Sequence, residues 1–181
     1  RYSGYRIIDP DSPLPDLPQG VRTAVLIPVY NEDPQSVGAG IAAMWRSLSA
    51  TGLEGRFDLF VLSDTTDPDV WVREEAMWNE LRGLPGMEGH LFYRRRPSNP
   101  KRKSGNIANF CRRWGRNYRY MIVLDADSVM AGETWVRMVD AMERNPRIGI
   151  LQTPPKGVNR ETLIARVQQF ANSLYGPLFA A

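Results

Sequence analysis

The chain has 181 residues, of which 43% are hydrophobic, so it can bury one substantial core and is not a disordered protein. Its net charge is only +3, and no apolar run approaches the roughly 20 residues that a membrane-spanning helix needs. Cys111 is the single cysteine, which excludes an internal disulfide and favours a reducing compartment. We also expect a soluble piece without a signal peptide.

The beginning of the chain differs in composition from the rest. Four prolines fall within residues 1–20 and predict an extended arm ahead of one domain over 21–181. After the arm, short runs rich in β-branched or aromatic residues are bounded by turn-forming residues and predict strands. These predicted strands cover residues 23–28, 57–63, 90–93, 120–124 and 148–153.

Between the predicted strands, apolar residues recur at helical spacing. Asp33 followed by Pro34 is typical of a helix start, and it precedes the first apolar stripe. Similar stripes predict helices within 70–81, 107–114 and 135–142, and Asn159 can cap a last one with a stripe over 163–174. Strands alternating with helices predict an α/β fold with a mostly parallel sheet.

The most informative residues follow the fourth predicted strand, where Asp125 and Asp127 flank Ala126. Open α/β sheets bind ligands beyond the carboxyl ends of their strands, and carboxylates there suit a divalent cation completed by phosphate oxygens. The alternative is a capped turn, because an isolated Asp-x-Asp pattern is common.

Two further strand ends carry polar groups at the same predicted edge. The first strand runs into Pro28-Val29-Tyr30-Asn31-Glu32, a rigid turn whose aromatic ring can pack against a base or sugar. The second ends at Asp64, which can accept hydrogen bonds from a base or ribose. The alternatives are an ordinary turn and a helix cap.

Lys103-Ser104-Gly105-Asn106 opens the third predicted helix and can form a diphosphate cradle from backbone amides and one lysine. It matches neither a Walker motif nor a dinucleotide-binding glycine triplet, which disfavours ATP-dependent phosphoryl transfer and nicotinamide chemistry. The six Lys and Arg residues within 94–103 predict a phosphate-binding surface, with a solvated loop as the alternative.

Taken together, these motifs resemble family 2 glycosyltransferases in order and approximate spacing, and Gln152-Thr153-Pro154 extends the match. Segments 92–96, 101–107, 110–114 and 175–179 are most similar to the membrane-bound glucosyltransferases of osmoregulated periplasmic glucan synthesis. The resemblance implies a GT-A (Rossmann-like) fold, a UDP-glucose donor, a divalent cation (Mg²⁺ or Mn²⁺) and inverting transfer to a growing β-glucan. A cellulose-synthase-like or other family 2 polysaccharide synthase is the alternative.

The resemblance also implies roles for individual residues. It places Pro28, Tyr30 and Glu32 near the uridine with Val29 between them, Asp64 at the base or ribose, and Lys103, Gly105 and Asn106 beside the nucleotide. Asp125 and Asp127, with Ala126 between them, would hold the metal and the diphosphate.

The family's general base lies in a Thr-Glu-Asp motif and its acceptor-end site in a Gln-x-x-Arg-Trp motif, and neither follows Gln152 here. We therefore expect a C-terminally truncated fragment that contains no catalytic base and binds nucleotide without turnover. The parent protein would meet its glucan acceptor at the cytoplasmic face of the bacterial inner membrane, reached through regions absent from this chain.

The sequence leaves three other functions as alternatives. A noncatalytic nucleotide-sugar sensor would keep the donor site without a base, and a nucleotidyltransferase would form the nucleotide sugar. A nucleic-acid-binding module would leave the acidic strand ends unexplained, so we expect no nucleic-acid partner. Two prominent residues receive no functional role. His90 lacks a partner acid at ligand spacing and is predicted to be structural or at the surface, and Cys111 is predicted to be packed on its helix.

Overall fold

The computed structural model describes residues 8–9 and 11–153. Residues 13–140 form one compact unit, and the described residues on either side of it belong to a second unit. The helix predicted from Asn159 onward lies outside the described residues. In the part that is described, no helix is both long and apolar enough to cross a bilayer.

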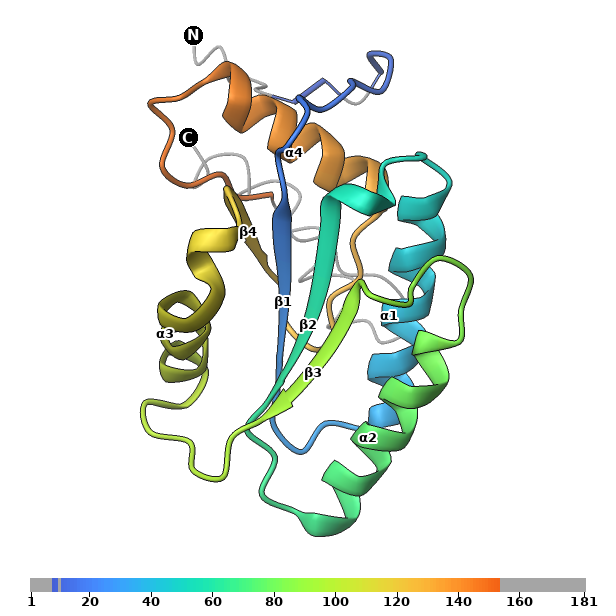
Figure 1. Cartoon of the computed structure of the whole chain (residues 1–181), viewed down its shortest axis with the longest axis vertical. Coiled ribbons are helices and arrows are strands. Elements are labelled where there is room, and N and C mark those ends of the chain that lie inside the picture. Colours follow the sequence, from blue (N-terminus) through green and yellow to red (C-terminus); the bar gives the residue numbers. More distant parts are fainter. Residues whose placement is uncertain (1–7, 10, 154–181) are drawn as a thin grey trace, which may run out of the picture. The chain divides into compact units, whose positions relative to one another are not determined.

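The unit formed by residues 13–140 is built on a four-stranded sheet in the order β3-β2-β1-β4 (Figure 1). Its strands are β1 (Thr23–Val29), β2 (Phe57–Ser63), β3 (Leu91–Arg95) and β4 (Tyr120–Val123). All three neighbouring pairs are parallel, so the carboxyl ends of the strands lie at one edge. The predicted α/β class with a parallel sheet is confirmed.

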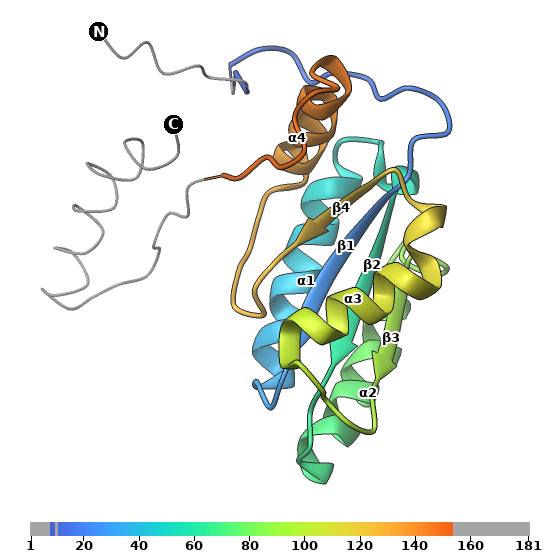
Figure 2. The same cartoon turned by 90° about the vertical axis from the view of Figure 1, so that its left-hand side faces the viewer.

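Helices connect the strands and cover both faces of the sheet. They are α1 (Pro34–Ser49), α2 (Pro68–Arg82), α3 (Arg102–Trp114) and α4 (Gly132–Arg144), with short 3₁₀ turns at Glu54–Arg56 and Gly115–Asn117. Helices α1 and α2 lie on one face, and α3 lies on the other (Figures 1 and 2). Crossover connections between parallel strands are right-handed, so the face that a helix covers depends on the direction in which the chain moves across the sheet. The chain moves one way from β1 through β2 to β3 and then back to β4, which places α3 on the opposite face from α1 and α2.

Helices α1 and α2 begin in the same way. The Asp33 carboxylate accepts a hydrogen bond from the backbone N–H of Ser36 at 2.9 Å, and Asp67 accepts one from Asp69 at 2.9 Å. Proline occupies the first helical position in both, where its missing N–H costs nothing. The predicted start of α1 at Asp33 is confirmed.

The core lies on both faces because the side chains of a strand alternate. Every residue of β1 and β2 is buried, as expected for parallel strands covered on both sides. One face packs Val25, Ile27, Leu59 and Val61 with the apolar stripes of α1 and α2. The other face packs a smaller cluster against α3: Ala24, Leu26, Phe60, Leu62 and Phe110.

Two predictions about local structure were wrong. Residues 148–153 form no strand: the Ile148 N–H donates to the Asn145 carbonyl at 2.9 Å in a turn, and Ile150 is 88% exposed. A strand exists only through a ladder partner, and among the described residues this segment has none. Cys111 is exposed, since α3 turns Phe110 toward the sheet and the next residue away from it.

Of the structural or surface role predicted for His90, the structure shows the structural one, and its partner is Asp58, an acid 32 residues away in the sequence. Asp58, only 1% exposed, contacts His90 Nδ1 at 2.9 Å and accepts hydrogen bonds from Tyr118 Oη at 2.7 Å and from Arg22. Asp58 lies near the amino end of β2, far along the strand from its carboxyl end. A buried carboxylate with this many partners is satisfied and needs no ligand.

Candidate functional site

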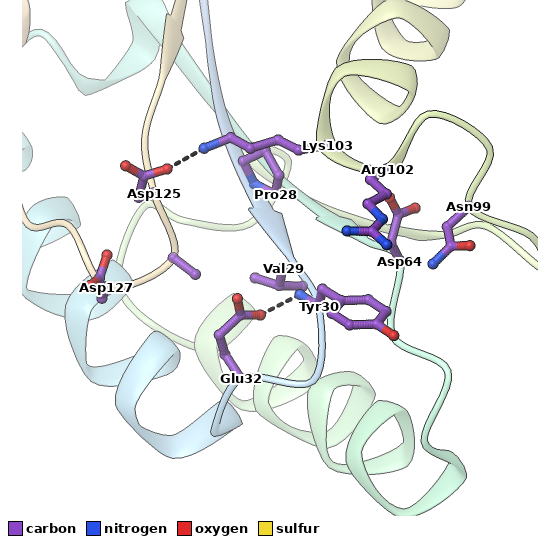
Figure 3. A pocket seen from close by; sticks show the side chains of 11 residues that line it. Pro28, Val29, Tyr30, Glu32, Asp64, Asn99, Arg102, Lys103, Asp125 and Asp127 are labelled. Atoms are coloured by element: carbon purple, nitrogen blue, oxygen red, sulfur yellow. Dashed lines mark hydrogen bonds and ion pairs between the residues drawn. The ribbon is translucent and has the colours of Figure 1, made fainter.

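A cavity of about 840 Å³ lies at the edge of the sheet where β1, β2 and β4 end (Figure 3). Its volume is within the range of about 300–1,000 Å³ that is common for small-molecule sites. It is lined by residues from these three strand ends and from the start of α3: Pro28, Val29, Tyr30, Glu32, Asp64, Asn99, Arg102, Lys103, Asp125, Ala126 and Asp127.

The predicted site residues line this cavity, with the exception of Gly105 and Asn106. A Cβ atom on Gly105 would lie 2.0 Å from the Pro100 carbonyl oxygen, so this glycine lets the chain approach its own backbone. Asn106 is fully buried, and its Nδ2 donates to the Leu62 carbonyl at 3.0 Å. Both residues therefore support the local fold at the start of α3 and do not line the cavity.

The Asp125-Ala126-Asp127 loop follows β4 directly. The backbone N–H of Leu124 donates to the Leu26 carbonyl at 3.0 Å, which continues the β4 ladder with β1 up to the loop. Asp125 then forms an ion pair with Lys103 across the cavity (Figure 3). The side chains are 69% and 46% exposed, and exposed pairs of this kind contribute little, so a competing cation and anion can take their places.

The donor set of this loop fits a hard divalent cation. Asp125 and Asp127 offer carboxylate oxygens, which Mg²⁺ and Mn²⁺ prefer, and both are exposed to the cavity. Within the described residues, no group of three His, Cys, Asp or Glu side chains gathers to enclose a metal. A cation here would therefore have one or two carboxylate ligands, with phosphate and water oxygens completing its shell.

Asp64 forms a buried part of the cavity wall. Its two carboxylate oxygens accept hydrogen bonds from Arg96 Nε and Nη2, both at 2.7 Å, and the two side chains are only 6% and 10% exposed. Arg96 also donates to the Arg102 carbonyl at 3.2 Å, which connects this pair to the start of α3. Because a carboxylate has about four acceptor positions, Asp64 can still accept a hydrogen bond from a ligand.

The β1–α1 turn brings an aromatic ring and an acid to the cavity. Tyr30 is 51% exposed, and its backbone N–H donates to the Glu32 carboxylate (Figure 3). Asn31 between them has φ of 57°, in the left-handed region that asparagine tolerates better than most residues. This conformation turns the chain sharply enough for both neighbours to line the same cavity.

The basic run 94–103 is divided between internal contacts and the cavity. Arg94 donates to Asn106 and Asn109, and its pKa is lowered by burial and by the neighbouring charges of Arg96 and Arg113. Arg95 Cζ lies 4.3 Å from the centre of the Trp71 ring, and Arg96 forms an ion pair with Asp64. Of the run's six cations, only Arg102 and Lys103 line the cavity.

Asn99 was not predicted as part of the site, and Arg96 and Arg102 were expected only as members of the basic run, without the separate roles that the structure gives them. Lys101 and Arg102 both have positive φ, 60° and 48°, and the turn they form brings Asn99 to the cavity wall. No periodic pattern in the sequence signals such a turn. The charge density around Arg96 and Arg102 was the only available signal.

The family model described as "Glycosyl transferase family 2" matches residues 24–179, which include every residue of the cavity.

Several curated proteins are similar to the chain. A protein of Pseudomonas paraeruginosa is 51% identical over 177 residues, and one of Escherichia coli K12 is 53% identical over 160 residues. These matches cover 98% and 88% of the chain, and both proteins carry the name "Glucans biosynthesis glucosyltransferase H". The chain spans only about a fifth of their length, 21% and 19%.

Proposed function

The chain belongs to glycosyl transferase family 2, and we propose that it is the donor-binding part of an inverting glucosyltransferase that transfers glucose from UDP-glucose to a growing β-glucan. The names of the similar proteins support a glucan product. The observation that carries the proposal is the meeting of Asp125, Asp127 and Lys103 with Tyr30 and Asp64 around one cavity.

Each side of the cavity suits a different part of a nucleotide sugar. Tyr30 and Glu32 would border the uridine, and Asp64, held by Arg96, would accept a hydrogen bond from the base or ribose. The diphosphate would then lie toward Lys103 and the Asp125-Ala126-Asp127 loop.

The reaction develops negative charge on the β-phosphate as UDP leaves. Lys103 is able to exchange its exposed contact with Asp125 for a phosphate oxygen, and a charge that grows in the transition state is stabilised more there than in the ground state. Asp125 and Asp127 would hold a Mg²⁺ or Mn²⁺ ion, which supplies further positive charge at the leaving diphosphate.

Inverting transfer also needs a general base for the acceptor hydroxyl. We propose that this base belongs to a part of the whole protein other than this chain, because the Thr-Glu-Asp motif of the family does not follow Gln152 in the sequence. The chain alone would then bind nucleotide without turnover. The whole protein would meet its glucan acceptor at the cytoplasmic face of the bacterial inner membrane.

A thermal-shift panel tests the proposed donor class. A ligand that binds only the folded chain raises its melting temperature. With Mg²⁺ present, UDP-glucose is expected to raise the melting temperature more than GDP-mannose or ATP. The difference between UDP-glucose and UDP-galactose measures how strongly the site discriminates between the two sugars. An equal response to all four would reflect general attraction to polyanions and would contradict the proposal.

A further inference from the structure

Two loops at the edge of the cavity are tied together by Asn31. Its backbone N–H donates to Thr65 Oγ1 at 3.0 Å, and its side-chain Oδ1 accepts from the backbone N–H groups of Thr66 at 3.2 Å and Asp67 at 3.3 Å. The β1–α1 turn is thereby held to the loop between β2 and α2. Asn31 itself does not line the cavity, although Tyr30 and Glu32 on either side of it do.

The contact continues inward to a buried acid. Because Thr65 Oγ1 accepts the hydrogen bond from Asn31, its own proton is free to be donated, and it is donated to Glu74 Oε1 at 2.5 Å. The second oxygen, Glu74 Oε2, accepts from Tyr93 Oη at 2.9 Å. Thr65 and Glu74 are only 1% and 2% exposed.

A glutamate at this position is costly unless its oxygens are satisfied, since a buried polar group without partners is strongly unfavourable. The other buried residues of α2 are Val70, Met77 and Leu81, so an apolar side chain would also suit the position of Glu74. The carboxyl group instead contacts two hydroxyls, and one of these contacts leads directly to the backbone of the cavity turn.

We propose that Thr65 and Glu74 are positioning residues for nucleotide binding. They hold the backbone of Asn31 in its left-handed conformation, so that Tyr30 and Glu32 are already placed when the nucleotide arrives. A binding site that is held in its bound geometry avoids the entropic cost of ordering a loop. This inference rests on the proposed function of the cavity.

The test compares two substitutions at one position. Thr65→Val keeps the shape of the side chain but removes the hydroxyl, whereas Thr65→Ser keeps the hydroxyl. In calorimetric titrations with UDP and Mg²⁺, Thr65→Val is expected to weaken binding by about five- to tenfold, as for the loss of one to two hydrogen bonds. Thr65→Ser should stay within about twofold of the unchanged chain. The exposed neighbour Thr66 gives a control, because Thr66→Val leaves these contacts intact.

A second readout does not depend on any ligand. Hydrogen exchange at the Asn31 amide should accelerate in Thr65→Val and remain slow in Thr65→Ser, because only the first variant loses the acceptor. The inference is overturned if Thr65→Val binds UDP as well as the unchanged chain, or if both variants lose affinity equally. Failure of the unchanged chain to bind UDP would instead count against the proposed function, and the exchange result would still stand.

If Thr65→Val does not fold, Tyr93→Phe tests the same connection from its other end. This substitution removes only the hydroxyl, which contacts Glu74 and also Ser63, and keeps the ring against Trp78, 6.2 Å between centres. We expect UDP affinity to fall by about two- to fivefold. An affinity equal to that of the unchanged chain would contradict the inference.

Discussion

At the scale of single residues, four acids of this protein lie in two kinds of environment. Asp58 and Glu74 are buried, and each contacts at least two side chains. Asp125 and Asp127 are exposed at the cavity, where a ligand can reach them. Burial and contacts therefore separate the acids that support the fold from those that can hold a cation.

The contact between Tyr118 and Asp58 predicts a loss of stability at alkaline pH. Burial raises the pKa of Tyr118 well above its usual value, and the hydrogen bond to Asp58 raises it further. A raised pKa in the folded state means that the stabilisation is complete below the unfolded-state pKa of about 10 and declines as pH rises above it. Urea denaturation is expected to show a falling free energy of unfolding from about pH 10 upward.

Tyr118→Phe separates this effect from general alkaline denaturation. The variant removes one hydrogen bond to Asp58, so we expect it to be less stable at neutral pH by about 1 kcal/mol. Because phenylalanine does not ionise, the free energy of unfolding of the variant should fall less steeply above pH 10 than that of the unchanged chain. Equal slopes for the two proteins would show that Tyr118 is not responsible.

Residues that follow a strong pattern could be predicted, and residues placed by irregular loops could not. Asp64, Asp125 and Asp127 follow apolar strands, and parallel pairing brings such positions to one edge. Asn99 reaches the cavity only through the positive φ angles at Lys101 and Arg102. Asn106 was predicted to lie beside the nucleotide but does not line the cavity. Lys103, three residues earlier on the same helix, lines it, while Asn106 is buried in the core.

At the scale of elements, the start of α4 packs closely against the end of α1. The Gly132 N–H donates to Ser47 Oγ at 2.9 Å, and a Cβ atom on Gly132 would lie 2.3 Å from Leu48 Cα. Backbone atoms cannot move aside as a flexible side chain can. The close approach of the two helices therefore depends on the absence of a side chain at this position.

Gly132→Ala is consequently expected to lower the free energy of unfolding by about 1–3 kcal/mol, the usual cost of overpacking. Gly40→Ala in the interior of α1 provides a matched control, since its Cβ would make an ordinary contact of 3.5 Å with Val129. There we expect a gain of about 0.5–1 kcal/mol from helix propensity. Urea denaturation measures both, and a stable Gly132→Ala protein would contradict this account of the packing.

Elements with long and regular patterns were predictable from the sequence. The four strands of the sheet and the start of α1 follow from apolar periodicity and one capping aspartate. The failure at residues 148–153 has a physical cause, because β-branched and apolar composition fits a strand but does not supply the neighbour that pairs with it. The packed state expected for Cys111 failed for a related reason, since helical spacing alone does not set the width of the buried face.

At the scale of the whole molecule, the parallel sheet explains how motifs separated by nearly a hundred residues reach one cavity. Tyr30 and Asp127 follow β1 and β4, which pair directly in the sheet. Local pattern and global topology therefore lead to the same site, which is the consistency expected of a sequence that specifies one fold.

We propose that this cavity binds a nucleotide diphosphate through a divalent cation held by the Asp125-Ala126-Asp127 loop. Calorimetric titration of the chain with UDP, with and without Mg²⁺, tests it most directly, with Asp125→Asn as the comparison. We predict binding that depends on Mg²⁺ and that weakens at least about tenfold in Asp125→Asn, with the melting temperature unchanged. Equal UDP affinity with and without Mg²⁺, or no binding by a folded chain, would contradict the account.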